Sequence, residues 1–495
     1  MRTAILAALI VALVAPGAVP AQVSTASDSA LASMDTVTGR IDGELPLGRI
    51  IRRITSRADT SQRYALYLPS SLTRDKQWPV LFLLDPRGRA LIPLQRFRAA
   101  AERLGYITIS SYNTLSDGPG QPNYDALTAM LADVQQSLPV DARRFYLAGF
   151  SGTTRFAWQV STQIGSAIAG IVGTGASVPT GRAWTRAKIG KSSPVLFGTV
   201  GTLDPNYEEL RDLDADLDAI GLPHHIERFD GGHQWPPVEL STRALEWLDL
   251  QAMRRELEPR QQSWIDSLYS AWLAKAERVE SAGDVAGAAR AYRLLGADFR
   301  GLTSVAAVDA HLAVLQRDPR VRKSEAVEVA VAERDRAWTS AMLSVITDIQ
   351  REPTPPSFDD ARKRLDLDRI RREAARGDDS TSAVAAKRAE ERIFSFMSFY
   401  VPREQLDARR YAHAALALRL ARVLKPTDGG ACFSHARALA QLSDKPGALD
   451  ALECAAASGQ VNAAAVEGDA LLAPLHGEIR YDAVVRQLRE RRPGG

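Results

Sequence analysis

Several features are scarce in this 495-residue sequence, and each scarcity narrows the class of protein. Only two cysteines are present, Cys432 and Cys454, too few for a cysteine-rich zinc site. The formal net charge of +3 is small for the length, and no basic run is interleaved with aromatics, which argues against a dedicated nucleic-acid binder. We find no glycine-rich phosphate loop, dinucleotide fingerprint or metal-ligand cluster, and therefore expect neither cofactor nor metal.

Long apolar runs are absent beyond the N-terminus, so we expect no membrane span. The chain opens with MRTAILAALIVALVAPGAVPAQ, which has one basic residue, an apolar run from Ala4 to Ala15 and a small-residue end. Val19 and Ala21 fit the small-x-small cleavage rule, so residues 1–21 are predicted to be a signal peptide of an exported protein, periplasmic or secreted. A buried helix or a membrane anchor is the alternative, but an anchor needs roughly 20 apolar residues.

The rest of the sequence has a globular composition, with 45% apolar and 24% charged residues, and is long enough for two or three domains. Over residues 36–256, short β-branched runs such as PVLFLLD, RFYLAGF and PVLFGTVG alternate with longer helical stretches. Apolar runs of this length, each followed by a helix, predict an α/β fold in which helices cover both faces of a parallel sheet.

Residues 260–495 lose the strand pattern and are rich in Ala, Leu, Arg and Glu with helical periodicity, which predicts an all-α domain of helical hairpins. In WLAKAERVESAGDVAGAARAYRLL, bulky, small and turn residues alternate as in a tetratricopeptide hairpin, and Ala414 and Ala448 are one such repeat, 34 residues, apart. The region therefore resembles tetratricopeptide repeats, which would offer a surface for a protein partner. Generic Ala-rich hairpins remain the alternative.

Cys432 and Cys454 flank a turn near Ser443 at about equal distances, so antiparallel helices would bring them to a similar height. In an oxidising compartment such a pair forms a disulfide, which we predict here. The alternative is two reduced cysteines that act as small core residues.

The stretch YLAGFSGTTRFAW combines a strand, a serine and a helix in immediate succession. Gly149 and Ser151 fit the nucleophile-elbow pattern Gly-x-Ser-x-Gly, but Thr153 occupies the last glycine position and Gly152 comes one residue early. We expect Thr153 to be tolerated if its side chain points away from the sheet. Ser151 is either a nucleophile or a small polar residue at a tight turn.

Two further segments place an acid and a histidine after later strands. Asp204 lies in FGTVGTLDPNY and His233 in RFDGGHQWPP, so that Ser151, Asp204 and His233 each follow a strand, where an open parallel sheet has its active site. A serine hydroxyl needs such a base to become nucleophilic, and a carboxylate behind the imidazole fixes its tautomer. Each residue also has an ordinary structural interpretation, and Asp230 and Glu208 are rival acids.

The segments GFSG, GTLD and GGHQWP make the chain up to about residue 256 resemble an α/β-hydrolase of the esterase type, related to feruloyl esterases, dienelactone hydrolases and polyhydroxybutyrate depolymerases. The resemblance implies a serine esterase with Ser151 as nucleophile, His233 as base and Asp204 as acid, acting on a small-molecule or polymer ester. A peptidase using the same triad is one alternative. An interaction protein with an inactive hydrolase half is another.

The same resemblance indicates where the oxyanion donors and the substrate should lie. The backbone N–H of Gly152 is the first expected donor. Relatives often carry a His-Gly motif in the loop that here reads DPRGRA; Pro86 has no N–H, so Arg87 is predicted as the second donor. Tyr112, in the polar loop SYNTLSDGPGQPNYD, and Trp235 are the expected substrate-binding residues; packing against the last helix is the alternative for Trp235.

Overall fold

The computed structural model describes residues 36–38, 40–41, 43–178, 193–377 and 380–490. The predicted signal peptide lies outside these residues. The described chain divides into two compact units between Glu325 and Ala326. The sequence pattern predicts a boundary near residue 260, where strands give way to helices. The compact units divide further along, inside a long helix.

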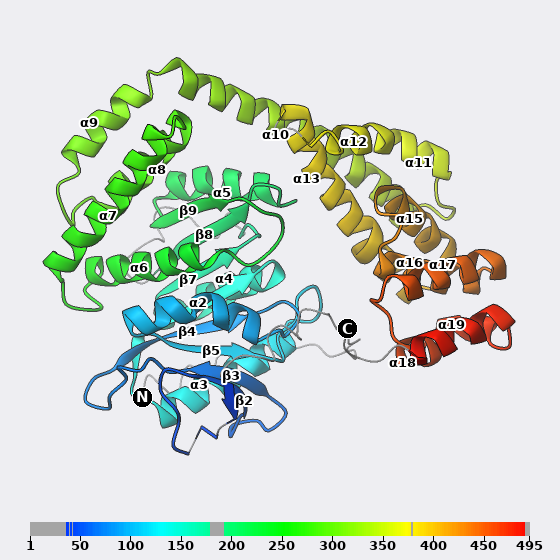
Figure 1. Cartoon of the computed structure of the whole chain (residues 1–495), viewed down its shortest axis with the longest axis horizontal. Helices are drawn as coiled ribbons and strands as arrows, with labels where there is room; N and C mark the ends of the chain where they lie inside the picture. The colour runs from blue at the N-terminus through cyan, green and yellow to red at the C-terminus, as the bar shows by residue number, and fades with distance from the viewer. Residues whose placement is uncertain (1–35, 39, 42, 179–192, 378–379, 491–495) are drawn as a thin grey trace. The chain divides into compact units, whose positions relative to one another are not determined.

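A nine-stranded sheet forms the centre of the first unit, in the order β1-β2-β3-β5-β4-β6-β7-β8-β9 (Figure 1). Strand β3 pairs antiparallel with both β2 and β5, and all other neighbours are parallel. The strands are β1 (Thr36–Thr38), β2 (Ile50–Thr55), β3 (Arg63–Tyr67), β4 (Trp78–Leu84), β5 (Ile107–Ser111), β6 (Val140–Phe150), β7 (Gly170–Thr174), β8 (Val195–Gly201) and β9 (His224–Phe229).

Helices cover both faces of this sheet, which explains why strands such as β4, WPVLFLL, are buried throughout. Helices α3, α4 and α5 contribute to the main apolar core on one face, while α2 and α6 pack together on the other. The covering helices are α2 (Leu91–Leu104), α3 (Gln121–Ser137), α4 (Gly152–Ile164), α5 (Tyr207–Ile220) and α6 (Val238–Arg254), with the short 3-10 turn η2 (Gly165–Ala167). The predicted α/β fold, a sheet covered by helices on both faces, is confirmed.

Three more helices belong to the first unit: α7 (Gln262–Ser281), α8 (Val285–Phe299) and α9 (Ala306–Leu315). A buried polar network joins them to the sheet, because His225 of β9 contacts Asp298 of α8 (Nδ1···Oδ2, 2.8 Å) and the indole of Trp247 in α6 donates to the same carboxylate (2.6 Å). Burial lowers the pKa of His225, but the carboxylates of Asp298 and Glu227 outweigh burial and raise it to about 9. The imidazole is therefore a charged, fully buried link.

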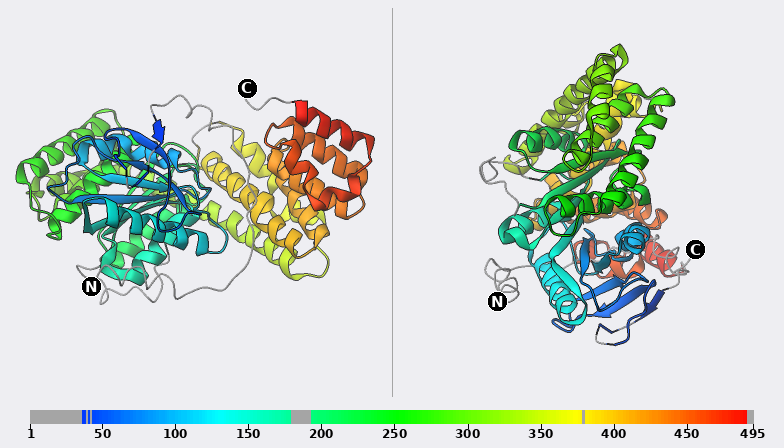
Figure 2. Two further views of the ribbon diagram at one scale, coloured as in Figure 1. Left: turned by 90° about the horizontal axis from the view of Figure 1, so that it is seen from below. Right: turned by 90° about the vertical axis from the view of Figure 1, so that its left-hand side faces the viewer.

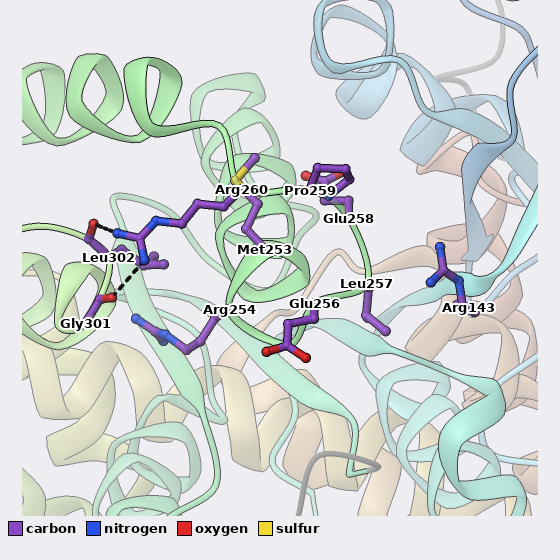
Figure 3. A pocket seen from close by; sticks show the side chains of 10 residues that line it. All are labelled: Arg143, Met253, Arg254, Glu256, Leu257, Glu258, Pro259, Arg260, Gly301 and Leu302. Carbon is purple, nitrogen blue, oxygen red and sulfur yellow. Dashed lines mark hydrogen bonds between the residues drawn. The ribbon is translucent and has the colours of Figure 1, made fainter.

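A cavity of about 650 Å³ lies where the appended helices meet the amino ends of the parallel strands (Figure 3). Arg143 of β6 and the residues after α6 line it. Arg260 donates to the carbonyl oxygens of Gly301 and Leu302, and Arg254 donates to two other backbone carbonyls. These guanidinium groups are already hydrogen-bonded, and the cavity lies away from the carboxyl ends of the strands.

The described residues of the second unit form helices joined by turns, as predicted, and helices adjacent in sequence pack as hairpins (Figure 2). Helix α10 begins in the first unit and continues into the second. The elements are α10 (Pro319–Arg351), α11 (Phe358–Arg364), α12 (Leu367–Ala374), α13 (Thr381–Ser395), the π-helical turn η4 (Phe396–Tyr400), α14 (Val401–Asp407), α15 (Tyr411–Leu424), α16 (Gly429–Gln441), α17 (Lys445–Ala457), α18 (Ala463–Glu467), the 3-10 helix η5 (Ala470–Leu475) and α19 (Ile479–Glu490).

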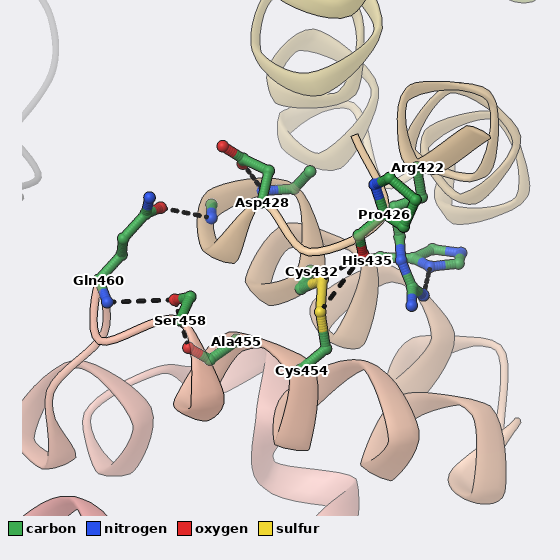
Figure 4. The surroundings of a disulfide bond; sticks show 11 residues. Arg422, Pro426, Asp428, Cys432, His435, Cys454, Ala455, Ser458 and Gln460 are labelled. Carbon is green, nitrogen blue, oxygen red and sulfur yellow. Dashed lines mark hydrogen bonds between the residues drawn. A yellow bond between two sulfur atoms is a disulfide. The ribbon is translucent and has the colours of Figure 1, made fainter. Parts of the chain in front are cut away.

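A disulfide joins Cys432 of α16 to Cys454 of α17, with their Cα atoms 5.9 Å apart (Figure 4). Both helices have an aspartate N-cap, Asp428 for α16 and Asp444 for α17, which fixes where each begins. Small buried residues along both helices let their backbones approach closely. The predicted bridge is confirmed.

Candidate active site

Ser151 lies at the turn between β6 and α4, with φ 55° and ψ −126°. A positive φ is costly for a residue with a side chain, and such strain persists only where the surroundings impose it. Here the Ser151 N–H donates to the carbonyl oxygen of Thr174 in β7 (2.8 Å), and Thr154 N–H donates back to the Ser151 carbonyl oxygen (3.0 Å). The serine therefore sits at the carboxyl end of a central strand, at the N-terminus of a helix.

The two glycines beside Ser151 are required by close approach. A Cβ on Gly149 would lie 2.5 Å from the carbonyl oxygen of Thr153, inside the turn itself. A Cβ on Gly152 would lie 2.6 Å from the Cβ of Ser116, which belongs to the loop after β5. The early glycine in GFSGT thus makes room for a neighbouring loop.

The Thr153 side chain points toward the ends of two strands of the sheet. The expected condition for a threonine here, a side chain that points away from the sheet, is therefore not met. Its side chain is fully buried, and its hydroxyl donates to the Leu84 carbonyl oxygen at the end of β4 (2.5 Å). The same oxygen accepts the N–H of Phe150 (3.0 Å). Thr153 therefore ties the last residues of two central strands together directly beneath the nucleophile turn.

His233 and Asp204 form a hydrogen-bonded pair at the same edge of the sheet. His233 Nδ1 lies 2.9 Å from Asp204 Oδ2, and the other carboxylate oxygen accepts the N–H of Asn206 (2.8 Å). The Asp204 side chain is 0% exposed and that of His233 is 31% exposed, so the acid is enclosed while the imidazole reaches solvent. Such an arrangement holds the imidazole through Nδ1 and leaves Nε2 available for proton transfer.

The two rival acids lie elsewhere. Asp230 is exposed to solvent. Glu208 is buried but pairs with the Arg211 guanidinium, with 2.8 Å between Oε2 and Nη1.

The end of β7 brings the serine and the imidazole pair together. Thr174 accepts the Ser151 N–H, and a Cβ on the next residue, Gly175, would lie 2.9 Å from Asp204 Oδ2 and 3.1 Å from His233 Nδ1. The ring of Phe150, adjacent to Ser151, lies 4.6 Å from the His233 ring, centroid to centroid. No hydrogen bond joins the Ser151 hydroxyl to His233 within the described residues. Such bonds are often long before substrate binds.

The Arg87 N–H, predicted as an oxyanion donor, is already engaged in this structure. It donates to Asp85 Oδ1 at 2.9 Å, because the aspartate side chain folds back over the turn that follows β4. The Gly152 N–H, at the start of α4, faces no such competitor among the described backbone bonds. One predicted donor is thus available and the other is not.

The two residues predicted to bind substrate have other contacts. Trp235 is only 3% exposed, and its indole N–H donates to Asp85 Oδ2 (2.9 Å) while its ring packs on Phe150. The Tyr112 hydroxyl donates to the carbonyl oxygen of Arg52 in β2 (2.7 Å). Trp235 thus supports the histidine loop from within, and Tyr112 reaches toward the edge of the sheet.

Asp85 and Ser116 are the site residues that sequence reasoning missed. Asp85 is fully buried and also accepts two side-chain hydrogen bonds from Arg89, Nε to Oδ1 (3.0 Å) and Nη2 to Oδ2 (3.1 Å). Its position directly after the buried strand β4 was a usable signal, since Asp204 is found in the same way. Ser116 carries no signal in the sequence, because only the folded loop brings it to Gly152.

Among the described residues, no group of three His, Cys, Asp or Glu side chains is arranged to hold a metal ion. A search of the same residues finds no helix with the length and apolar character needed to cross a membrane.

Comparison with known proteins gives only distant structural likeness. No protein-family model matches the sequence, and neither does any curated protein. Similar solved structures include an S-formylglutathione hydrolase from Staphylococcus aureus (17% identity, TM-score 0.31, 38% of this chain and 90% of that one). Others are an esterase from Rhizomucor miehei (15%, 0.34, 51% and 97%) and a feruloyl esterase module from Clostridium thermocellum (14%, 0.32, 45% and 91%). Likeness at this level carries no inference about activity.

Proposed function

We propose that the chain is a serine hydrolase that cleaves carboxylic esters through an acyl-enzyme on Ser151. The observation that carries the proposal is the strained serine at the end of β6, held beside the His233–Asp204 pair. A non-glycine residue held at positive φ is costly, so its presence at this position favours a functional serine over an ordinary turn.

The mechanism follows from the roles that these three side chains can take. The Ser151 oxygen attacks the carbonyl carbon of the ester while His233 Nε2 takes the hydroxyl proton. Asp204 holds the Nδ1 proton and stabilises the imidazolium that forms. The tetrahedral intermediate then collapses, and His233 passes its proton to the leaving alcohol. Water repeats the sequence on the acyl-enzyme and releases the acid.

The first test measures whether Ser151 becomes covalently labelled. A fluorophosphonate should label the wild-type protein on Ser151, and the protein should hydrolyse an activated short-chain ester such as p-nitrophenyl acetate. Both signals should be lost in Ser151→Ala and nearly lost in His233→Ala, because the nucleophile or its base is gone. Ser161→Ala is the matched control, since that buried serine of α4 bonds only a helix carbonyl. Labelling that survives the first two changes would identify another nucleophile.

Amide bonds are the alternative substrate for the same triad, and a peptide p-nitroanilide assayed beside the ester would reveal a peptidase. An interaction protein with an inactive hydrolase half is the other alternative. It predicts no labelling and no turnover, and it rests on the sequential hairpins after residue 325, which resemble the tetratricopeptide architecture used for protein partners.

Export belongs to the same proposal. The N-terminal segment has the pattern of a signal peptide, and the Cys432–Cys454 disulfide is a bond that persists in oxidising compartments. We therefore propose that the enzyme acts in the periplasm or outside the cell.

A further inference from the structure

Oxyanion holes stabilise the tetrahedral intermediate with several positioned donors. Among the described amides of the nucleophile turn and of residues 87–89 after β4, the Gly152 N–H is the one without a competing acceptor. The Gly152 N–H opens α4 next to the nucleophile. The loop after β4, the other expected source, begins with Asp85 and Pro86, and its first amide, that of Arg87, donates to Asp85 Oδ1. Asp85 is fully buried and accepts several other donors, so this turn is fixed in place.

The hydroxyl of Ser116 is a side-chain donor close to Gly152. The Cβ of Ser116 is 2.6 Å, and its Oγ is 3.4 Å, from the position that a Cβ on Gly152 would occupy. Ser116 therefore covers the residue whose N–H is the first oxyanion donor. Ser116 as a residue is half-buried, and its hydroxyl donates to Asp117 Oδ2 at 2.5 Å.

The loop that carries Ser116 is held firmly in position. Ser116 N–H donates to the Pro86 carbonyl oxygen (2.9 Å), and the Thr114 hydroxyl donates to the Asp85 carbonyl oxygen (2.8 Å). The buried amide of Asn123 bonds both backbone groups of Leu115, accepting at 2.8 Å and donating at 2.7 Å. Because the loop is fixed in this way, only the hydroxyl proton of Ser116 has to turn when charge develops.

We propose that the hydroxyl of Ser116 is the second oxyanion donor, acting together with the Gly152 N–H. The proposal rests on the proposed function of Ser151. In the resting site the hydroxyl proton points to Asp117; in the tetrahedral intermediate it turns to the oxyanion, remains on Ser116, and no covalent bond at Ser116 changes. Because Asp117 is exposed, water replaces the lost hydrogen bond. The glycine at position 152 leaves room for this serine.

The test compares an ester with its thionoester, in which sulfur replaces the carbonyl oxygen and accepts hydrogen bonds poorly. In Ser116→Ala, kcat for the oxygen ester should fall by about 10²- to 10³-fold with KM nearly unchanged, because the lost contact exists only in the transition state. The thionoester should lose far less, so the oxygen-to-sulfur rate ratio should fall by about 10-fold or more. Ser61→Ala is the matched control: its hydroxyl also donates to an aspartate, Asp59 (2.7 Å), but on the β2–β3 turn.

Active sites are counted by fluorophosphonate titration, and thermal unfolding checks the fold of each variant. If Ser116→Ala does not fold, Ser116→Cys, which keeps the size but donates weakly, replaces it in the same comparison. If the variant keeps wild-type turnover, or loses turnover equally on the ester and the thionoester, the role proposed for Ser116 is wrong, and the proposed function of Ser151 still stands. A wild-type chain with neither labelling nor turnover overturns the proposed function, and this inference with it.

Discussion

At the residue scale, Thr153 occupies the position of the usual glycine, and its hydroxyl forms hydrogen bonds that a glycine could not form. Thr153→Val keeps the branched shape but removes the hydroxyl, leaving the buried Leu84 carbonyl and Phe150 N–H without this partner. A buried polar group left unsatisfied costs about 1–3 kcal/mol, and we expect a loss of that size in the free energy of unfolding. Denaturant unfolding measures it. Thr162→Val on the same helix is the control, because its hydroxyl bonds only the Gln159 carbonyl near the surface. Equal losses in both variants would contradict the strand-tying role.

The acid can be tested at the same scale. Asp204→Asn keeps the side-chain shape but removes the charge that stabilises the imidazolium and allows the wrong His233 tautomer. We expect ester turnover to fall by about 10³- to 10⁴-fold with the fold intact. Asp230→Asn, an exposed change directly after β9, should leave turnover near the wild-type value. The opposite ranking of the two variants would move the role to Asp230.

At the scale of elements, two features could be predicted because they depend on local signals. These are the strands of the sheet and the placement of Ser151, Asp204 and His233 after the ends of strands. An apolar run followed by a polar residue marks the carboxyl end of a buried strand, and parallel strands bring those ends together. The contacts of Asp85 with Trp235, and of Ser116 with Gly152, join loops that are distant in sequence. No local pattern encodes them. The engaged Arg87 amide differs, because it donates to Asp85 only two residues away, and an aspartate at a turn is a local signal that the sequence does contain.

The link between β9 and α8 predicts how stability depends on pH. The folded-state pKa of His225 is raised from 6.5 to about 9, so its contribution is fully present below pH 6.5 and is lost as pH rises through 9. Glu227 behaves oppositely: burial raises its pKa, but His225 and Arg243 lower it to about 2, so its contribution is lost as pH falls from 4.5 toward 2. We expect the free energy of unfolding of the first unit to fall by on the order of 3 kcal/mol between pH 6 and 9.5.

Denaturant unfolding across that pH range measures the effect. His225→Gln has no charge to lose, so it should start from lower stability at pH 6 and show a shallower decline toward pH 9.5. A variant whose decline parallels the wild type would show that other groups cause it. The proposed role of His225 would then be wrong, although Trp247 would still join α6 to α8, and Trp272 would still join α7 to α6.

At the scale of the whole molecule, the chain divides where contacts become few, and not where strands end. The change of pattern near residue 260 is visible in the sequence, but α7–α9 belong to the first unit. Asp298 of α8 contacts His225 of β9, and Trp272 of α7 donates to Glu246 of the covering helix α6. The bulky and small residues of α7–α9 also suit a helical repeat. Sequence periodicity shows which face of a helix is buried, and it does not say which partner buries that face.

The separate compactness of residues 326–490 makes the disulfide a test of both stability and export. Cys432→Ala with Cys454→Ala should lower the unfolding free energy of the helical unit by about 3 kcal/mol, the gain expected from closing a short loop. Ester turnover should be unchanged, because the site lies wholly in the other unit.

In protein recovered from the periplasm or medium, both thiols should resist alkylation until reduced, as mass spectrometry of non-reduced peptides would show. The same chain lacking residues 1–21 and made in the cytosol should alkylate at both positions, because that compartment keeps thiols reduced. Free thiols in the exported protein would contradict the bridge, and loss of turnover in the double variant would mean that the helical unit supports the active site.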